Sequence, residues 1–343
     1  MNIILQLLDP LYVKNFFTKE LLPRVPEMIE IKNISIEPIK ENIWNTTYHV
    51  VFRFITTFIN EAGEEAVWPI YCTAHSSEPR ESVHEALNFL WQANFSQGGL
   101  TVPHPLFYSP EFRAAFYRGV EGKLLYKSIK EKNFAEIESG VTKAAAWFSK
   151  LHSLPTKNVK NFNPQNSRIA TVVPGREHVL KKIGELYPEY LKIYERLYHL
   201  FTLREDSFLD STERLWLVHG DAHPENVILT ANHKLAMIDF TDLCLSDFAR
   251  DLGTFLQQLD YMAKHKTNEL AYTEKIKKLF LNSYLEFAKI KMDESLEARI
   301  NNYYLWTALR TASFFLFKHD AQPESARPLL EMICNKLNIN LNK

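Results

Sequence analysis

A short segment in the C-terminal half of the chain brings acidic, amide and imidazole side chains close together. It reads His219-Gly220-Asp221-Ala222-His223-Pro224-Glu225-Asn226, and an apolar run ending in Ile238-Asp239-Phe240 follows it. Asp221 comes after an apolar run, so we expect a loop that displays its carboxylate. A hairpin of residues 227–229 against 235–238 would bring Asn226 and Asp239 side by side. An amide oxygen and a carboxylate suit Mg²⁺ that carries nucleotide phosphates, and Asp221 beside them could serve as base for a hydroxyl.

The same residues allow a second chemical interpretation. His219, Asp221 and His223 could chelate the metal of a hydrolase, because imidazole and carboxylate groups are common metal ligands. That interpretation lacks a second cluster of histidine or acidic residues at ligand spacing, and it leaves Ile238-Asp239-Phe240 unexplained. The two histidines could also be loop residues whose ring nitrogens bond to the backbone, in which case they orient the loop.

The first third of the chain predicts a small sheet with one helix. Residues 1–30 indicate a helical lead-in, and alternation of apolar and polar residues over 47–58 and 66–73 predicts an antiparallel hairpin. A helix is expected from Ser76 and Ser77 onward, since Val83, Leu87 and Leu90 recur at helical spacing. We interpret residues 102–112 as a proline-rich connection that leads into a strand at 112–118.

The rest of the chain is predicted to be mainly helical, with β structure only at 215–240. Apolar residues at helical spacing predict helices over these segments: 137–151, 176–203, 247–263, 269–290 and 294–317. We therefore expect an α+β, two-lobed protein. Residues 1–118 would form the N-terminal lobe, and residues 119–343 would form a helical C-terminal lobe that holds the catalytic loop and the metal-binding hairpin.

The composition excludes several classes of protein. The 343 residues include 40 Lys and Arg against 41 Asp and Glu, a formal net charge of −1, which argues against broad binding to nucleic acid or anionic lipid. Hydrophobic residues make up 46% of the chain, so it can bury a large core. No apolar stretch approaches the roughly 18 residues that a membrane span needs. The N-terminus lacks signal-peptide features and three scattered cysteines suggest no disulfide framework, so we expect a soluble, cytoplasmic protein.

The spacing around Asp221 resembles that of protein-kinase catalytic loops, in which an Asp accepts the substrate proton and an Asn and a later Asp hold magnesium. The segments His-Gly-Asp-x-His-x-x-Asn and Ile-Asp-Phe are similar to the signature of the aminoglycoside phosphotransferase and choline kinase-like family. This resemblance implies a protein-kinase-like fold and dependence on ATP and Mg²⁺. It implies Asp221 as the catalytic residue, Asn226 and Asp239 as metal ligands, and a hinge from Tyr117 to Val120 that holds adenine.

Two further segments are similar to the same family. Leu151-His152-Ser153-Leu154-Pro155 resembles the end of one of its helices, and Phe248-Ala249-Arg250-Asp251 resembles the segment after the metal-binding Asp. In the family, the equivalent of Asp251 braces the catalytic loop and does not touch substrate. His152 is interpreted as a packed helix residue.

The nucleotide-binding half departs from the family pattern. The strand that should carry a phosphate-binding lysine, residues 68–74, contains no Lys or Arg, and Cys72 is the position we assign to that lysine. Glu85, with Glu81 as second choice, would be the helix residue that normally pairs with it. Residues 42–48 occupy the place of a glycine-rich loop without a glycine. Arg53 or Lys40 could supply the missing cation.

These patterns predict an ATP- and Mg²⁺-dependent phosphotransferase that moves a γ-phosphate to a hydroxyl of a small molecule such as a sugar, an amino alcohol or an aminoglycoside. The helical lobe, particularly residues 241–320, would form the pocket for the acceptor. Tyr303, Tyr304 and Trp306 could cage a quaternary ammonium, but a helical aromatic stripe is more typical of a core. The alternative is a pseudokinase or nucleotide-binding scaffold with little turnover and a protein partner, because the strand lysine is missing.

Overall fold

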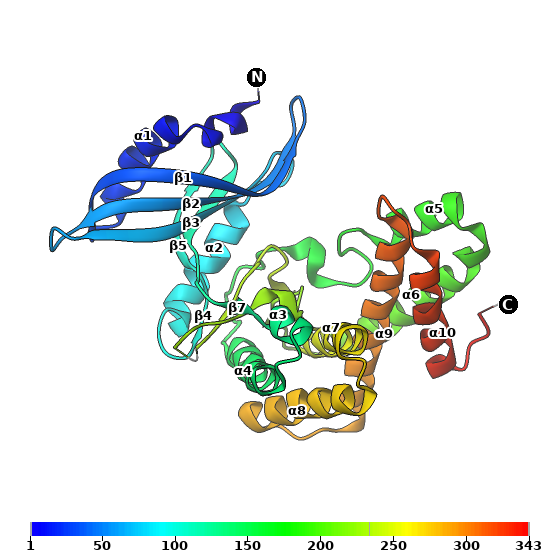
Figure 1. Ribbon diagram of the computed structural model, residues 1–343. Coiled ribbons are helices and arrows are strands. Elements are labelled where there is room, and N and C mark those ends of the chain that lie inside the picture. Colours follow the sequence, from blue (N-terminus) through cyan, green and yellow to red (C-terminus); the bar gives the residue numbers. More distant parts are fainter. Residues whose placement is uncertain (1, 233, 342–343) are drawn as a thin grey trace. The chain divides into compact units, whose positions relative to one another are not determined.

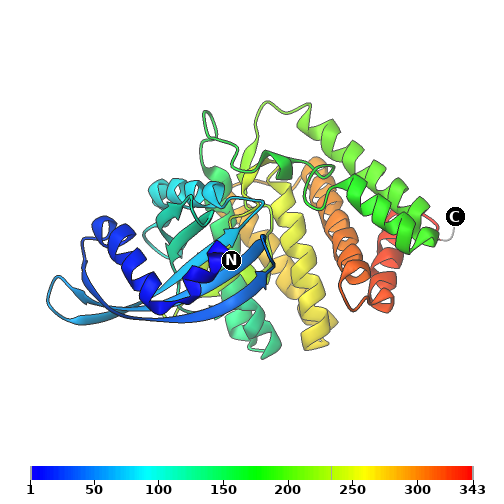
Figure 2. The ribbon, with the colours of Figure 1, turned by 90° about the horizontal axis from the view of Figure 1, so that it is seen from above.

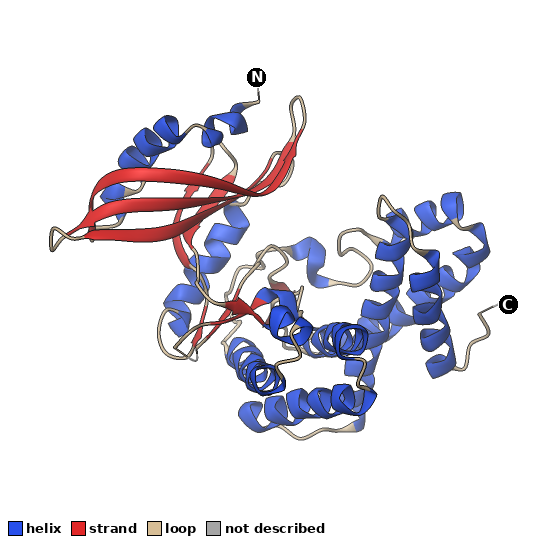
Figure 3. Cartoon of the chain, in the orientation of Figure 1, coloured by secondary structure: helices blue, strands red, loops and turns tan. Residues whose placement is uncertain are grey.

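The computed structural model describes residues 2–232 and 234–341, which form two compact units (Figure 1). The N-unit comprises Met1–Gly122 together with Ile228–Thr241, and the C-unit comprises Lys123–Val227 together with Asp242–Lys343. Segment 228–241 therefore packs with the N-terminal residues, which the expected division after residue 118 did not anticipate. Strands are concentrated in the N-unit and helices in the C-unit (Figure 3), so the predicted α+β class is confirmed.

The N-unit is built on one antiparallel sheet of order β1-β2-β3-β6-β5. The sheet strands and the helices α1 and α2 have these bounds: β1 Met28–Ile43, β2 Tyr48–Asn60, β3 Glu65–His75, β5 His104–Ser109, β6 Ala114–Arg118, α1 Pro10–Glu20 and α2 Glu81–Leu90. Short helical turns at Ile3–Leu8, Leu22–Arg24 and Trp91–Phe95 and the two-residue strand β4 (Leu100–Thr101) complete this part. The predicted hairpin of β2 and β3 is confirmed.

One face of this sheet is buried and apolar. The other, which we call the polar face, is mostly partly exposed and carries His49, Arg53, Thr73 and His75 among apolar residues. On one face Phe54, Cys72 and Phe116 join the hydrophobic core beneath α1, where the rings of Phe17 and Phe54 lie 5.3 Å apart. Because successive strand residues point to opposite faces, the neighbours of these residues form the second face. Cys72 pairs with Phe52 and Phe116, whereas Thr73 pairs with Val51 and Ala115 on the other side of the sheet. This alternation decides which residues can reach a ligand on the polar face.

Several predicted elements have different bounds in the structure. The expected connection at 102–112 contains strand β5, which is an edge strand, the position where proline is tolerated in a sheet. Helix α2 begins at Glu81 and not at Ser76 or Ser77. The single helix expected over 176–203 is two helices, because Pro188 occupies the first turn of the second one.

The C-unit contains most of the helices and a small amount of β structure. Its elements have these bounds: β7 Lys123–Leu124, α3 Leu125–Lys130, α4 Phe134–Ser153, α5 Arg176–Leu186, α6 Pro188–Leu209, β8 Trp216–Val218, β11 Cys244–Ser246, α7 Ala249–Thr267, α8 Leu270–Ala288, α9 Glu294–Phe317 and α10 Pro323–Leu337. Helix α10 was not predicted. In Figure 2, α5 and α6 in green lie beside α9 and α10 in orange and red.

The predicted hairpin after residue 226 is confirmed. Strands β9 (Val227–Leu229) and β10 (Leu235–Met237) are neighbours in one sheet, and β10 also pairs with β4 in parallel. The turn is closed by a hydrogen bond from the Thr230 nitrogen to the Lys234 carbonyl, 3.0 Å. His233, which we placed in this turn, lies outside the described residues.

Among the described residues, no helix combines the length and apolar character that crossing a membrane requires.

Candidate active site

The predicted catalytic loop leaves strand β8 through a turn that requires glycine. Gly220 has φ +83°, a backbone conformation that glycine adopts readily and other residues rarely do. A Cβ atom at this position would lie 2.3 Å from the carbonyl oxygen of Asp242. The glycine therefore satisfies both the backbone geometry and the close approach of the neighbouring chain, and it directs Asp221 away from the strand.

Asp251, at the start of α7, holds this loop. Its carboxylate accepts hydrogen bonds from the backbone nitrogens of His219 (2.7 Å) and Gly220 (3.0 Å). The ring of His152 lies 3.0 Å from the same carboxylate. Burial alone would raise the pKa of Asp251, but the hydrogen bond and charge of His152 outweigh it and hold that pKa below its ordinary value. The expected bracing role of Asp251 is confirmed, and His152 contributes to it from α4.

Asp221 is positioned by the two histidines of the loop. Its backbone nitrogen donates to His219 Nδ1 (3.3 Å), and its carboxylate lies 3.2 Å from His223 Nε2. Burial favours a higher pKa of Asp221, but the hydrogen bond and charge of His223 and the charges of Arg310 and His219 hold the pKa well below its usual range. The carboxylate is therefore ionised at neutral pH, and its side chain is 39% exposed.

Asn226 and Asp239 precede and follow the β9–β10 hairpin. The amide nitrogen of Asn226 donates to the Asp221 carbonyl (2.9 Å), which leaves the amide oxygen as the group able to coordinate a cation. Asp239 has φ +64°, and its Oδ1 accepts a hydrogen bond from the Thr241 nitrogen (3.3 Å). Asn226 belongs to the C-unit and Asp239 to the N-unit.

The rival interpretation of the loop as a chelating hydrolase site finds no support in this geometry. His219 is completely buried, and its Nδ1 accepts the backbone hydrogen bond of Asp221. Within residues 2–232 and 234–341, no group of three or more His, Cys, Asp or Glu side chains is arranged to hold a metal ion.

Our prediction that Cys72 takes the position of the phosphate-binding lysine is wrong. The Cys72 side chain is completely buried in the apolar core on the α1 side of the sheet, and burial raises the pKa of its thiol. Side chains alternate between the two faces of a strand, so the residues on either side of Cys72 point away from this core. Thr73 and His75 lie on the polar face instead, where a lysine would have to stand.

The other predicted nucleotide-binding residues belong to the N-unit. Glu85 lies on α2 and is partly buried; its charge acts on His84. Tyr117, near the end of β6, stacks on Tyr71 with 5.9 Å between ring centroids, and burial together with the charge of Asp239 raises the pKa of its hydroxyl. Val120 follows β6 and is partly exposed.

The segment between Tyr117 and Val120 is closely fitted to the sheet. The Gly119 nitrogen donates to the Pro69 carbonyl (2.7 Å), so this backbone group is already engaged. A Cβ atom at Gly119 would lie 2.3 Å from the Tyr71 ring. The glycine thus leaves room for the tyrosine ring beside the segment where we expected adenine to bind.

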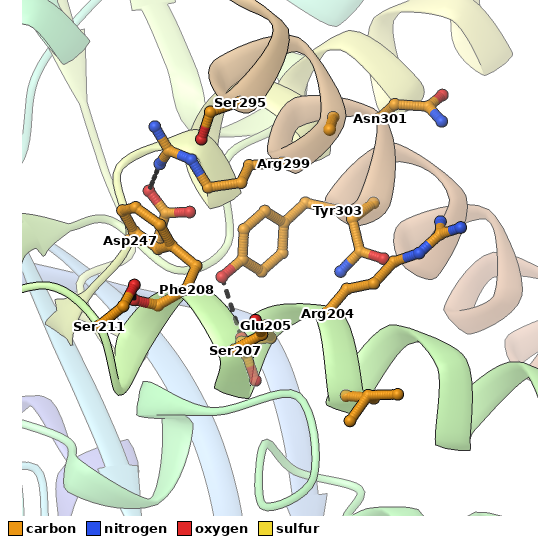
Figure 4. Close-up of a pocket in the computed structure, with 13 residues that line it drawn as sticks. Arg204, Glu205, Ser207, Phe208, Ser211, Asp247, Ser295, Arg299, Asn301 and Tyr303 are labelled. Atoms are coloured by element: carbon orange, nitrogen blue, oxygen red, sulfur yellow. Dashed lines mark hydrogen bonds and ion pairs between the residues drawn. The ribbon is translucent and has the colours of Figure 1, made fainter.

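A cavity of about 710 Å³ in the C-unit lies between α6 and α9 (Figure 4). Asp221, Asn226 and Asp239 do not line it, whereas Tyr303, from the range expected to bind the acceptor, does. Figure 4 shows the Tyr303 hydroxyl directed at Glu205, to which it donates (3.1 Å), and Arg299 paired with Asp247. Burial raises the pKa of Glu205 to about 7 against the hydrogen bond from the Ile169 nitrogen and the charge of Arg250.

The aromatic stripe of α9 is core. Tyr303 and Trp306 are each 1% exposed and Tyr304 8%, and the Tyr304 hydroxyl donates to Asp260 Oδ2 (2.8 Å). These rings therefore do not form an open cage for a quaternary ammonium. Sequence reasoning missed Arg250, which is completely buried and donates to the Gly220 carbonyl (3.2 Å). A signal was available, since this arginine stands directly before the bracing Asp251.

Comparisons with known proteins identify the family and the fold. The model of the phosphotransferase enzyme family (APH) matches residues 35–275. No curated protein matches the sequence. Choline kinase from Cryptosporidium parvum Iowa II is similar in structure, with a TM-score of 0.60, 16% identity and coverage of 95% of this chain and 94% of that chain. Ethanolamine kinase from Plasmodium vivax has a TM-score of 0.54, 13% identity and coverage of 88% and 81%. Spectinomycin phosphotransferase in complex with ADP and spectinomycin has a TM-score of 0.52, 10% identity and coverage of 97% and 96%. These likenesses confirm the kinase-like fold.

Proposed function

The chain belongs to the phosphotransferase enzyme family, and from that premise we propose that it transfers the γ-phosphate of ATP, with Mg²⁺, to a hydroxyl of a small molecule. The observation that carries the proposal is the catalytic loop. One buried carboxylate, Asp251, fixes its backbone, and a second carboxylate, Asp221, stands ionised and partly exposed at its tip. This combination suits a group that receives a hydroxyl of an incoming substrate.

Asp221 would orient the acceptor hydroxyl and receive its proton. Because the pKa of Asp221 is held well below its usual range, this carboxylate is a weak base toward a hydroxyl in the ground state. In a loose phosphoryl-transfer transition state, the attacking oxygen loses its proton late, so positioning matters more than early deprotonation. His223, 3.2 Å from the carboxylate, would keep it aimed.

The metal would be held by Asn226 and Asp239. Their donor atoms are an amide oxygen and a carboxylate, and Mg²⁺ prefers such hard oxygen ligands while keeping waters and substrate phosphates as the rest of its shell. Bound there, the ion would neutralise charge on the phosphates. Asp239 itself has a left-handed backbone conformation, and it stands two residues after the end of β10.

The nucleotide would bind at the N-unit, with adenine beside the backbone from Tyr117 to Val120 and Glu85 at the back of the site. The acceptor would bind in the helical C-unit. Among the similar structures, one is a choline kinase, one an ethanolamine kinase and one binds spectinomycin. For this chain we propose only that the acceptor carries a hydroxyl. A cytoplasmic location, where ATP and Mg²⁺ are supplied, completes the proposal.

One observation favours a second candidate function. Strand β3, Glu65–His75, contains no Lys or Arg, so the cation that the kinase scheme uses for the phosphates is missing from it. The alternative is a nucleotide-binding scaffold or pseudokinase with little turnover and a protein partner.

Calorimetry and thermal unfolding of the full chain with ATP, ADP and GTP, with and without Mg²⁺, test the proposal. We expect Mg²⁺-dependent stabilisation by a nucleotide that disappears in Asp239→Ala. The absence of any response at millimolar nucleotide would reject it. A following screen of hydroxyl acceptors separates the two functions, since a scaffold would bind nucleotide but transfer no phosphate to any of them.

A further inference from the structure

The polar face of the N-unit sheet carries a compact group of basic side chains, which we call the Arg80 cluster. It consists of Lys40 on β1, His49 at the start of β2, His75 at the end of β3 and Arg80 directly before α2. His49 and His75 are paired across β2 and β3, and their rings lie 4.8 Å apart. The cluster lies next to the turn of residues 44–47. Tyr48, which follows this turn, is hydrogen-bonded to Ser76, and the next pair along the two strands is His49 and His75.

Arg80 is an unusual cation because it is buried and poorly paired. The residue is 6% exposed, and its Nη1 lies 3.4 Å from Glu78 Oε2, at the long end of hydrogen-bond geometry. The Glu78 side chain is 58% exposed, so this pairing is largely solvated. The Nε atom of Arg80 is buried without any hydrogen-bond partner. A buried guanidinium normally requires an anion that uses several of its donors.

Lys40 adds a second positive charge beside Arg80. Its Nζ lies 3.1 Å from the ring nitrogens of His49. Burial and the charge of Arg80 lower the pKa of Lys40, and the carboxylate of Asp239 acts in the opposite direction. Lys40 thus lies within electrostatic reach both of Arg80 and of the proposed metal ligand, all in the N-unit.

The pKa values of the two histidines are lowered by the positive charges around them. Burial and then the charges of Lys40 and Arg80 lower the pKa of His49 to about 4. Burial and Arg80 also lower the pKa of His75, whose Nδ1 accepts hydrogen bonds from the backbone nitrogens of Ser77 and Glu78. Glu78 and Asp239 oppose this field only partly. Such a cluster is suited to an anion of high charge.

We propose that Arg80 and Lys40 bind the phosphates of the nucleotide and supply the positive charge that β3 lacks. This inference rests on the proposed function, and it assigns the phosphate contacts to residues outside the strand. A guanidinium offers planar paired donors to phosphate oxygens, and an ammonium adds a point charge. Arg53, the other candidate, is paired with Glu37 at 3.0 Å and lies four residues farther along β2 than His49.

Binding of a matched ligand series by the full chain tests the assignment. The ligands are ATP, ADP, adenosine and tripolyphosphate, each with Mg²⁺, measured by calorimetry against wild type, Arg80→Met, Arg80→Lys and Lys40→Met. We expect Arg80→Met to weaken ATP binding by about 10- to 100-fold and adenosine binding by less than about twofold, because only the phosphates lose a contact. Arg80→Lys should restore part of the loss, and Lys40→Met should weaken ATP in the same selective way.

Control variants separate this from loss of fold and from the competing assignment. Lys32→Met removes an exposed β1 lysine that pairs with Glu30, and it should bind every ligand as wild type does. Thermal unfolding without ligand identifies any variant that fails to fold, and Lys40→Met then carries the test. If wild type binds ATP and both variants retain that affinity, or if Arg53→Met alone loses it, the inference is overturned while the proposed function stands. If wild type responds to none of the four ligands, both fail.

Discussion

Asp251 Oδ2 lies 2.7 Å from the backbone nitrogen of His219, thirty-two positions earlier in the chain. The other oxygen of the same carboxylate accepts the Gly220 nitrogen at 3.0 Å. Two consecutive backbone donors of a buried turn are therefore satisfied by one side chain, and an unsatisfied buried donor would cost about 1–3 kcal/mol. The conformation of the catalytic loop is thus fixed by the C-unit itself before any ligand binds.

Replacing Asp251 by Asn should destabilise the protein and impair the loop. An amide has a single acceptor oxygen, so its NH₂ group would face a backbone N–H or His152 and leave a buried donor unpaired. We expect the free energy of unfolding to fall by about 2–4 kcal/mol, measured by urea unfolding, with loss of phosphate transfer. Asp320→Asn, at a fully exposed site, should change stability by less than about 0.5 kcal/mol. Equal stability of the two variants would show that Asp251 is no brace.

Replacing Asp221 by Asn should remove turnover without removing nucleotide binding. The amide is isosteric but cannot accept a proton, and a positioned base typically contributes about 10²- to 10⁴-fold to the rate. We expect phosphate transfer to fall by that factor while the Kd for MgATP stays within a few-fold, measured by a coupled assay and calorimetry. Asp210→Asn, whose carboxylate pairs with Arg168 on the surface, is the control and should retain full activity. Full activity in Asp221→Asn would refute the assigned role.

The sequence predicted the short strands that flank the proposed site residues, because these strands depend on local spacing. Asp221, Asn226 and Asp239 flank short apolar runs, and the β9–β10 hairpin follows directly from these runs and the polar turn between them. The sequence did not predict in the same way which side chains of β3 face which side of the sheet. Trp68, Pro69 and Ile70 are consecutive buried residues, so the period-two signal is lost, and a shift of one residue moves every side chain to the other face. The sequence therefore did not reveal that Cys72 lies in the apolar core.

The sequence offered little indication of residues whose role depends on tertiary contacts. Arg80 stands in a loop between a strand and a helix, and its charge acts on Lys40 and His49, which belong to two other strands. Strand β5 resembled a connection, because the sequence does not reveal that it is an edge strand. The burial of Arg250 and Glu205 depends on helices far apart in sequence and appears only when these helices pack.

Alanine at Gly220 should be far more damaging than alanine at another left-handed glycine. Gly63 has φ +77°, and no atom lies within 4 Å of the position that an alanine Cβ would occupy, so Gly63→Ala isolates the backbone cost, about 1–2 kcal/mol. Gly220 has a similar φ of +83°, but its Cβ would also meet the Asp242 carbonyl at 2.3 Å. We expect Gly220→Ala to cost about 3 kcal/mol or more in urea unfolding and to abolish activity. Similar losses in both variants would mean that the neighbouring chain can move aside.

Glu205 should make the stability of the protein depend on pH. Its pKa is raised from the ordinary 4.5 to about 7, so the folded state binds this proton more tightly than the unfolded state does. This tighter proton binding contributes its full stability below about pH 4.5, and the contribution is lost as the pH rises through about 7. The free energy of unfolding should therefore fall over that range by at most about 3 kcal/mol. Glu205→Gln keeps a neutral side chain of the same shape and should remove this part of the slope. Urea unfolding between pH 5 and 8 measures it, with Glu195→Gln on the exposed side of α6 as the control that keeps the wild-type slope. An unchanged slope in Glu205→Gln would show that the carboxyl ionises in the folded protein as it does in the unfolded chain, and that Arg250 and the Ile169 nitrogen fully offset its burial.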